Sequence, residues 1–185
     1  MTKRYIIWLA VCAVGFASLL PGCPSALAAE TTLPHGKLDA AVVKKVEWEL
    51  RTLARKFAEQ GKADKETVFA LLVNYLWKNP EIYGAAYAMA PETRNGKEVK
   101  SCPYVYRRGE QLIQKDLSTT YDYTAPEQKW YAKPVKLGRP VWSEPSLDQS
   151  GSGAWMTTYS IPVYAGGKER QLIAVVTSEV LLPTE

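Results

Sequence analysis

The sequence is poor in the side chains that most catalytic and metal sites require. Its one histidine, His35, lies in a short polar stretch near the N-terminus, which leaves no Ser-His-Asp or Cys-His arrangement in the chain. HExxH and CxxC motifs are missing, and Asp, Glu, His and Cys residues do not cluster at the spacing of metal ligands. We therefore expect no enzyme activity, no catalytic residue, no metal and no cofactor.

Two short motifs resemble enzyme sites but lack the context of one. Residues 150–153 (SGSG) open no helix and no lysine follows them, which argues against a phosphate-binding loop. Glu144 and Asp148 lie close together as a glycosidase pair might, but carboxylates beside a proline bend are more often turn caps and solvated groups. A hydrolase therefore has little support.

The chain also lacks a strong charge and a supply of cysteines. Its net charge of +4 falls to +2 without Lys3 and Arg4, so there is no electrostatic footprint for nucleic acid. Cys12 and Cys23 lie near the N-terminus, and Cys102 is the only later thiol. We expect Cys102 to be a buried apolar residue without an intramolecular disulfide; a bridge between two copies is the alternative.

The N-terminus has the pattern of a secretory signal peptide. Two basic residues precede an apolar run over 6–20, and the segment up to Ala28 contains no acidic residue. This run is shorter than the ~20 apolar residues that span a bilayer, and no later run is longer. We predict a signal peptide over 1–28, a linker over 29–37 and a single domain over 38–182.

This region contains two candidate sites for cleavage of the signal peptide. Residues 26–28 (ALA) form an A-x-A site that would leave Ala29 as the first mature residue, in a periplasmic or secreted protein. Residues 20–23 (LPGC) resemble a lipobox, in which Cys23 would carry the lipid of a membrane-anchored lipoprotein.

Two helices and then a series of strands are expected after the linker. Apolar residues recur every three or four positions over 38–60 and again over 68–76, and Asp64 is a candidate N-cap between the two helices. Strands are expected over 82–90, over 104–107 with its continuation to 113, and over 140–144, 155–163 and 172–182. Helices followed by sequential strands indicate an α+β fold with one antiparallel sheet.

One segment has no pattern that predicts a helix or a strand. The lid, as we name residues 121–134 (YDYTAPEQKWYAKP), carries four aromatic residues among prolines and charges, although surface loops normally avoid such apolar mass. Either the lid seals one face of the sheet, or it closes over a ligand, a task that suits the flat faces and polar tips of Tyr and Trp. Because Trp130 and Tyr131 are neighbours, we expect one ring to pack on the sheet and the other to face the ligand.

The order of motifs along the chain resembles Cache domains, the PAS-like extracytoplasmic sensor modules also described as PDC domains. The resembling segments are 79–84 with 91–92, 103–107, 121–124, 130–131, 140–145, 148, 156–159, 162 and 174–182. The likeness covers residues 38 to 182. It implies a five-stranded antiparallel PAS-like sheet, a long N-terminal helix packed along it, and binding of a small metabolite outside the cytoplasmic membrane.

The resemblance also implies a ligand site. In members of the family that bind amino acids or amines, the ligand is held by an aromatic residue, an arginine, a Trp-Tyr pair and an acidic residue in the last strand. The matching residues here are Tyr123, Gln128 in place of the arginine, Trp130 with Tyr131, and Glu179. Further candidates are Arg107, Tyr121, Trp142, Asp148 and Tyr159.

The departures from the pattern affect the expected ligand. Glutamine is a neutral donor of about half the strength of an arginine's charge-assisted pair, so Gln128 argues against an α-amino acid unless Arg107 or Lys129 supplies the cation. Glu179, near the end of a buried strand, requires a partner, which a cationic ligand would supply.

From the resemblance we predict an extracytoplasmic protein that binds an amine, an amino acid or a small organic acid. Because the chain ends at Glu185, shortly after the last strand, we expect it to act through a separate membrane signalling protein. A homodimer through the N-terminal helix is a further expectation. The alternative is a structural or interaction protein that keeps the Cache fold without a ligand.

Overall fold

The computed structural model describes residues 38–148, 152–166 and 170–183. The predicted signal peptide, both processing sites with Cys23, and His35 lie outside the described residues.

Two helices begin the domain, as the sequence predicts. The N-cap of helix α1 (Ala40–Gln60) is Asp39, whose carboxylate accepts a hydrogen bond from the Ala41 amide, and the helix ends at Gly61, which has a positive φ of 69°. Helix α2 (Lys65–Lys78) begins at Asp64, whose side chain accepts from the Thr67 amide. The predicted N-cap at Asp64 is confirmed.

The main sheet is antiparallel and contains five long or medium strands and two very short ones. Its strand order is β5-β4-β1-β9-β8-β6, and β7 pairs with β8 beside β6. The strands are β1 (Gly84–Met89), β4 (Pro103–Arg108), β5 (Gln111–Asp116), β6 (Val141–Trp142), β7 (Ser146–Leu147), β8 (Trp155–Tyr164) and β9 (Leu172–Leu181). The predicted α+β, PAS-like fold is confirmed; β6 lies within the strand predicted over 140–144, and β7 is an addition at the same edge of β8.

A small hairpin extends from the main sheet. Strands β2 (Glu92–Arg94) and β3 (Lys97–Val99) pair with each other around Asn95 and Gly96, which both have positive φ. This is the turn that the Asn-Gly pair predicts.

The prediction of one continuous strand from 104 to 113 is wrong. The chain turns at Gly109, which has φ +60°, and β5 folds back on β4 with Arg108 opposite Gln111.

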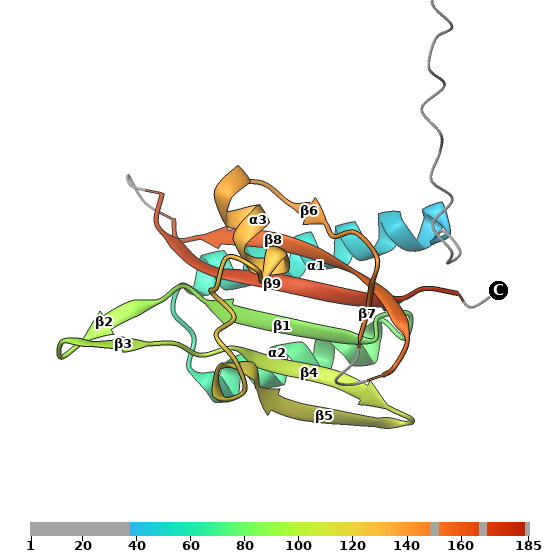
Figure 1. Ribbon diagram of the computed structural model, residues 1–185, viewed down its shortest axis with the longest axis horizontal. Coiled ribbons are helices and arrows are strands. Elements are labelled where there is room, and N and C mark those ends of the chain that lie inside the picture. The colour runs from blue at the N-terminus through green and yellow to red at the C-terminus, as the bar shows by residue number, and fades with distance from the viewer. Residues whose placement is uncertain (1–37, 149–151, 167–169, 184–185) are drawn as a thin grey trace, which may run out of the picture. The chain divides into compact units, whose positions relative to one another are not determined.

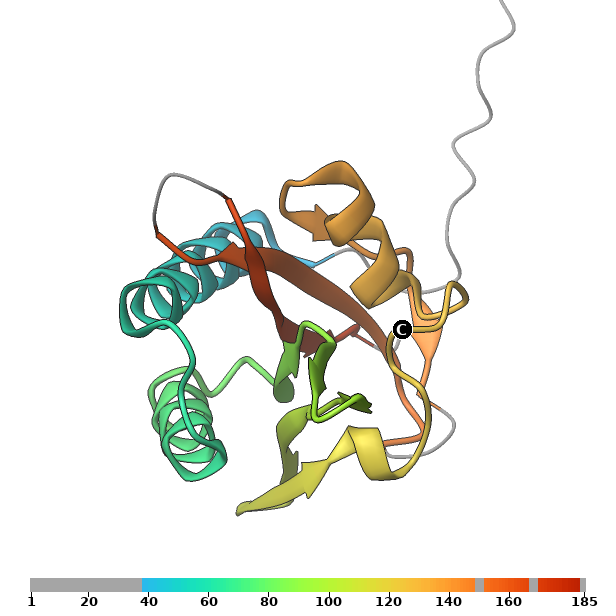
Figure 2. The same cartoon turned by 90° about the vertical axis from the view of Figure 1, so that its left-hand side faces the viewer.

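The sheet is covered on both faces. Figures 1 and 2 show α1 and α2 on one face, which we name the helix face, and helix α3 (Lys129–Leu137) on the other, which we name the lid face. Side chains alternate between the faces along each strand. Ala85, Val105 and Val176 join the core under α1 and α2, whereas Ala86, Cys102 and Val175 join a smaller core with Tyr123 and Tyr131.

The expectation of an irregular lid is wrong for its second half. Residues 129–137 form α3, although Pro134 lies inside it and removes one backbone donor. A nine-residue helix has few intrahelical hydrogen bonds to lose, and Tyr131 and Pro134 are buried beneath it. Packing on the sheet therefore outweighs the poor local helix propensity.

Candidate ligand site

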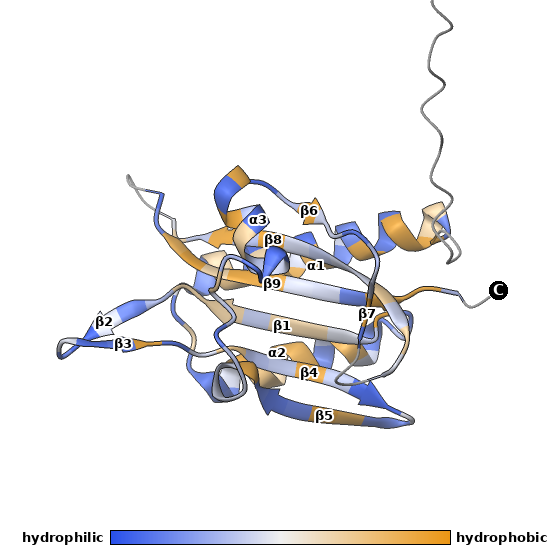
Figure 3. Cartoon of the chain, in the orientation of Figure 1, coloured by the Kyte–Doolittle hydropathy of each residue, from blue (hydrophilic) through white to orange (hydrophobic). Residues whose placement is uncertain are grey.

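The polar part of the lid face lies in the second half of β9. Figure 3 shows β9 changing along its length from hydrophobic to hydrophilic, where Val175-Val176 give way to Thr177-Ser178-Glu179. Ser178 faces α2, because its hydroxyl is 2.7 Å from that of Tyr75. By alternation, Thr177 and Glu179 face the lid.

Glu179 lies in the middle of a cross-strand row. Its partner on β8 is Thr158 and its partner on β1 is Gly84, which in turn lies opposite Tyr106 of β4. Directly opposite residues share one face of a sheet, so these side chains border the same space.

Glu179 is partly buried, and its carboxylate has one direct hydrogen-bond donor on β4. The Tyr104 hydroxyl donates to Glu179 Oε2 over 2.5 Å. Burial raises the pKa of Glu179 to about 7, against the lowering effect of that hydrogen bond, and the negative charge of Asp148 adds to the rise. Burial, together with the charge of Glu179, also raises the pKa of Tyr104.

Gly84 makes this pairing possible. A Cβ atom at position 84 would lie 2.5 Å from Glu179 Oε2 and 2.6 Å from the Tyr104 hydroxyl. The absence of a side chain at Gly84 therefore lets Glu179 and Tyr104 meet across β1.

A cleft of about 350 Å³ opens beside this row, between α3 and residues 141–146. Its floor includes Thr158 and Ser160 of β8, and its walls include Gln128 and Trp130 on one side and Trp142 on the other. The Ser160 hydroxyl is buried and has no hydrogen-bond partner among the described residues. We name this space the α3 cleft; its size and lining suit a small molecule with polar groups.

Trp130 and Tyr131 diverge as the sequence suggests, although they do so from a helix. Tyr131 is buried and contacts the rings of Tyr123 and Trp130 edge-on, with centroids 5.4 and 6.0 Å away. Trp130 lines the α3 cleft, and its indole N–H donates to Gln128 Oε1 over 3.2 Å. The side chains of Trp130 and Gln128 are therefore hydrogen-bonded to each other and both line the α3 cleft.

Tyr123 has a different place from the one predicted. Its side chain is fully buried, and its hydroxyl donates to the Met89 carbonyl over 2.7 Å. The ring therefore fills the lid-face core instead of lining an open space. The adjacent Tyr121 is partly exposed.

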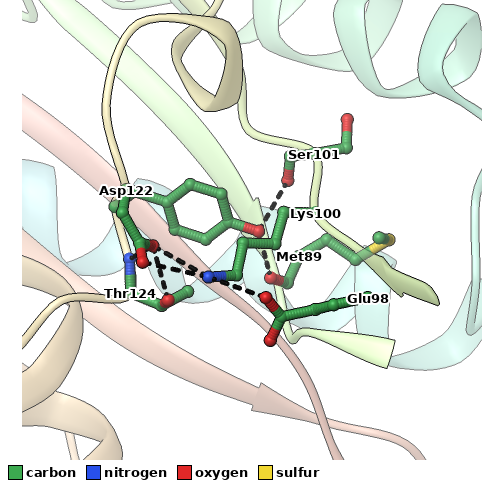
Figure 4. Close-up of polar contacts among 7 residues, drawn as sticks. Met89, Glu98, Lys100, Ser101, Asp122 and Thr124 are labelled. Atoms are coloured by element: carbon green, nitrogen blue, oxygen red, sulfur yellow. Dashed lines mark hydrogen bonds and ion pairs between the residues drawn. The ribbon is translucent and has the colours of Figure 1, made fainter. Parts of the chain in front are cut away.

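An ionic network next to Tyr123 fastens the start of the lid. Lys100 lies 3.0 Å from Asp122 and 3.1 Å from Glu98, and the Asp122 carboxylate accepts from the amide and hydroxyl of Thr124 (Figure 4). These contacts keep the pKa of Asp122 low, at about 2, with the Thr124 hydroxyl as the largest cause.

Three further predicted residues have partners away from the α3 cleft floor. The Arg107 guanidinium donates to the carbonyls of Leu76, Asn79 and Ile82 at the end of α2. Tyr159 is buried on the helix face beside the Arg51 guanidinium. Trp142 reaches the same side, because its indole N–H donates to Glu47 of α1 over 2.9 Å.

The site also includes residues that were not predicted from the sequence. Tyr104 and Ser160 are the main additions, whereas the predicted Asp148 lies near Glu179 as a negative charge. Tyr104 is 75 positions from Glu179, so only the strand register reveals their contact. The polar residues Thr157, Thr158 and Ser160 in a buried strand were the available signal for Ser160.

Searches for metal sites and membrane spans give no candidate within the described ranges. There, no three His, Cys, Asp or Glu side chains group as metal ligands. No helix in residues 38–148, 152–166 and 170–183 has the length and hydropathy to cross a membrane.

Comparison with known proteins identifies one family. The family described as "Methyl-accepting chemotaxis protein-like, first PDC sensor domain" matches residues 68–184. No curated protein matches the chain significantly.

Solved structures share the fold at low sequence identity. The extracellular domain of soHK1S-Z6, described as that of a histidine kinase, is 24% identical with a TM-score of 0.66. The ligand-binding domain of the Pseudomonas aeruginosa PAO1 amino acid chemoreceptor PctC, in complex with GABA, is 19% identical with a TM-score of 0.51. The periplasmic sensory domain of the Campylobacter jejuni chemoreceptor Tlp1 is 10% identical with a TM-score of 0.52. Each covers 76% of this chain, which spans 54%, 57% and 54% of their respective lengths.

Proposed function

The chain belongs to the family of methyl-accepting chemotaxis protein-like first PDC sensor domains, and on this premise we propose that it binds a small amine or zwitterion outside the cytoplasm. Binding, without catalysis, is the proposed activity. The proposed ligand lies on the lid face, with its polar end at Glu179 and its remainder in the α3 cleft.

The proposal rests on the environment of Glu179. Burial of a carboxylate costs free energy unless its charge is paired, and the Tyr104 hydroxyl is a neutral partner. A ligand ammonium group would supply the missing charge and would favour the ionised form of Glu179. The rings of Trp130 and Tyr121 lie on the lid above the same face and suit a cation or an alkyl chain.

Gln128 narrows the ligand class. Its carbonyl oxygen accepts from Trp130, so its amide N–H groups remain to donate toward the cleft. A neutral amide holds a carboxylate more weakly than an arginine does. We therefore favour an amine, or a zwitterion whose carboxylate contributes less to affinity than its ammonium group.

The location and the partner are also proposals. Export through the N-terminal signal, with Ala29 or a lipidated Cys23 as the first residue, agrees with the extracellular and periplasmic relatives. Those relatives come from chemoreceptors and a protein described as a histidine kinase, which supports a membrane signalling protein as the partner.

A thermal-shift titration tests the proposal. γ-Aminobutyrate, butylamine and butyrate form a matched set that carries both charges, the ammonium alone or the carboxylate alone. We expect the two ammonium compounds to raise the melting temperature by several degrees at 100 times their Kd, where binding adds about 2.7 kcal/mol. Butyrate should have no effect.

Two variants locate the response. Glu179→Gln removes the charge at nearly constant volume and should abolish the shift, whereas Glu59→Gln, at an exposed acid of α1, should not. Trp130→Ala should reduce the thermal shift.

Tyr131→Ala is a poorer probe, because loss of a buried ring costs about 3–5 kcal/mol of stability by itself. A folded parent that responds to no amine would favour the structural or interaction protein.

A further inference from the structure

A second cleft lies on another part of the sheet from the α3 cleft. It has a volume of about 340 Å³ and lies over β4 and β5. The strand order places β1 and β9 between β4 and the β8 floor of the α3 cleft. We name it the tyrosine cleft; the lining residues used below are Tyr83, Tyr104, Tyr106, Arg108, Lys115 and Asp148.

Three tyrosines give this cleft a flat aromatic surface. The rings of Tyr104 and Tyr106 are stacked, with centroids 5.4 Å apart and planes inclined by 11°. Tyr83 lies next to Tyr106 at 6.2 Å. The hydrogen bond from Tyr104 to Glu179 fixes the orientation of its ring. A planar apolar ring is the ligand group that such a surface accommodates best.

Two cations border the aromatic surface. Lys115 lies directly opposite Tyr104 on β5, so its side chain emerges on the same face, and it makes no ion pair with a described residue. The Arg108 guanidinium lies 5.7 Å from the centre of the Tyr106 ring and donates to its hydroxyl over 2.7 Å. Arg107 also lines the cleft, but its guanidinium is engaged by the α2 carbonyls.

The positive and negative side chains that line the tyrosine cleft belong to different segments of the chain. Lys115 and Arg108 belong to the β4–β5 hairpin, whereas Asp148 belongs to the segment that follows β7 and accepts a hydrogen bond from the Ser152 amide over 2.6 Å. We expect an anionic ligand group to pair with the hairpin cations, and a ring attached to it to lie against the tyrosines.

We propose that the tyrosine cleft is a second binding site, for a small aromatic carboxylate. The ring stacks on Tyr104 and Tyr106, and the carboxylate pairs with Lys115 and Arg108. A volume near 340 Å³ is at the small end of ligand pockets and suits a single-ring compound. Tyr104 contributes its ring to this site and its hydroxyl to Glu179, so the two sites share that residue, and Asp148, a charge near Glu179, also lines this cleft.

Isothermal titration of the full-length chain, expressed with its own N-terminus, tests the proposal with benzoate. Benzamide keeps the ring without the charge, and cyclohexanecarboxylate keeps the charge without the planar ring. We expect benzoate to bind at least tenfold more tightly than either. Lys115→Met should weaken benzoate about tenfold through loss of a charge-assisted contact, whereas Lys97→Met, at an exposed cation of β3, should not.

Further variants make the result decisive. Arg108→Met repeats the test at a second exposed position, so the conclusion does not depend on the folding of one variant. Trp130→Ala should leave benzoate binding intact while it weakens the response to amines. Absence of benzoate binding at millimolar concentration, equal binding of benzamide, or loss of benzoate binding in Trp130→Ala would each overturn the second site. None of these results bears on Glu179 as an amine site.

Discussion

The environment of Glu179 moves its pKa toward neutral pH. Its pKa in the folded protein, about 7, exceeds the ordinary value of 4.5, so the folded state takes up the proton first as the pH falls. The contribution of Glu179 to stability is therefore fully present below about pH 4.5, declines as the pH rises through 7, and is constant at higher pH.

We predict that Glu179→Gln removes this dependence. The free energy of unfolding of the parent, relative to that of the variant, should fall by the order of 2 kcal/mol between pH 5 and pH 8. Urea unfolding at four pH values measures it, and subtracting the variant cancels the shared contribution of carboxylates such as Asp116 and Asp122, which have lowered pKa values. A difference that does not change with pH would show that Glu179 is ordinarily solvated.

Gly84 supplies the second prediction at this scale. Gly84→Ala places a methyl group within 2.6 Å of both Glu179 and Tyr104, and one of the two side chains must move. We expect a loss of about 1–3 kcal/mol in urea unfolding and loss of the thermal shift by amines. Gly166→Ala, where nothing lies within 4 Å of the new Cβ, is the matched control. Equal effects of the two changes would contradict the close approach at Gly84.

At the scale of elements, Arg107 joins the sheet to the end of α2. Its guanidinium donates to the carbonyls of Leu76, in the last turn of α2, and of Asn79 and Ile82, which follow the helix. Arg107→Ala should therefore lower the free energy of unfolding by about 2–3 kcal/mol, and the remaining folded protein should still respond to amines. Arg108→Ala, one position later and exposed, should cost less than 1 kcal/mol. An amine response lost with little change in stability would instead place Arg107 in the ligand site.

The outer surface of α1 gives a prediction about association. Val46, Leu50 and Phe57 are buried beneath the helix, whereas Trp48 is 67% exposed. If α1 carries the homodimer interface, Trp48→Ser should shift the protein toward the monomer in sedimentation equilibrium. Trp77→Ser, at a similarly exposed position of α2, is the control. A parent that is strictly monomeric at high micromolar concentration, with and without ligand, would contradict the dimer.

Elements with strong periodicity could be predicted from the sequence, and those held by distant contacts could not. The apolar spacing of α1, the Asp64 cap and the Asn95-Gly96 turn are local signals, and the structure follows each of them. Helix α3 has no such signal, because burial of Tyr131 and Pro134 stabilises it. The β4–β5 turn does have a local signal, Gly109 within a charged stretch, although the predicted strand runs through it.

The same distinction holds for the site. Glu179 stands out as a carboxylate in an apolar strand, and Trp130 as an aromatic residue in a polar segment. The pairing of Glu179 with Tyr104 depends on the register of three strands, which no short stretch of sequence specifies. The burial of Tyr123 depends on how closely the lid lies on Met89 and Ser101, which is also a tertiary property.

At the scale of the whole protein, processing of the N-terminus is the main prediction. Intact-mass measurement of the secreted form should give a chain that begins at Ala29, because residues 26–28 match the A-x-A cleavage pattern. A mass that corresponds to a diacylated or triacylated Cys23 terminus would assign the lipoprotein route instead.

The pairing of β1 with β9 has a consequence for how the chain folds. Gly84 lies opposite Glu179 and Met89 opposite Ala174, so the centre of the sheet joins segments separated by 85 to 95 positions. Contacts this distant raise the contact order and slow folding, since a long loop must close before the strands can stabilise each other. Synthesis from the N-terminus produces β1 well before β9, so β1 waits without one of its two neighbours in the sheet. In the export that we propose, such a delay would keep the precursor unfolded until translocation.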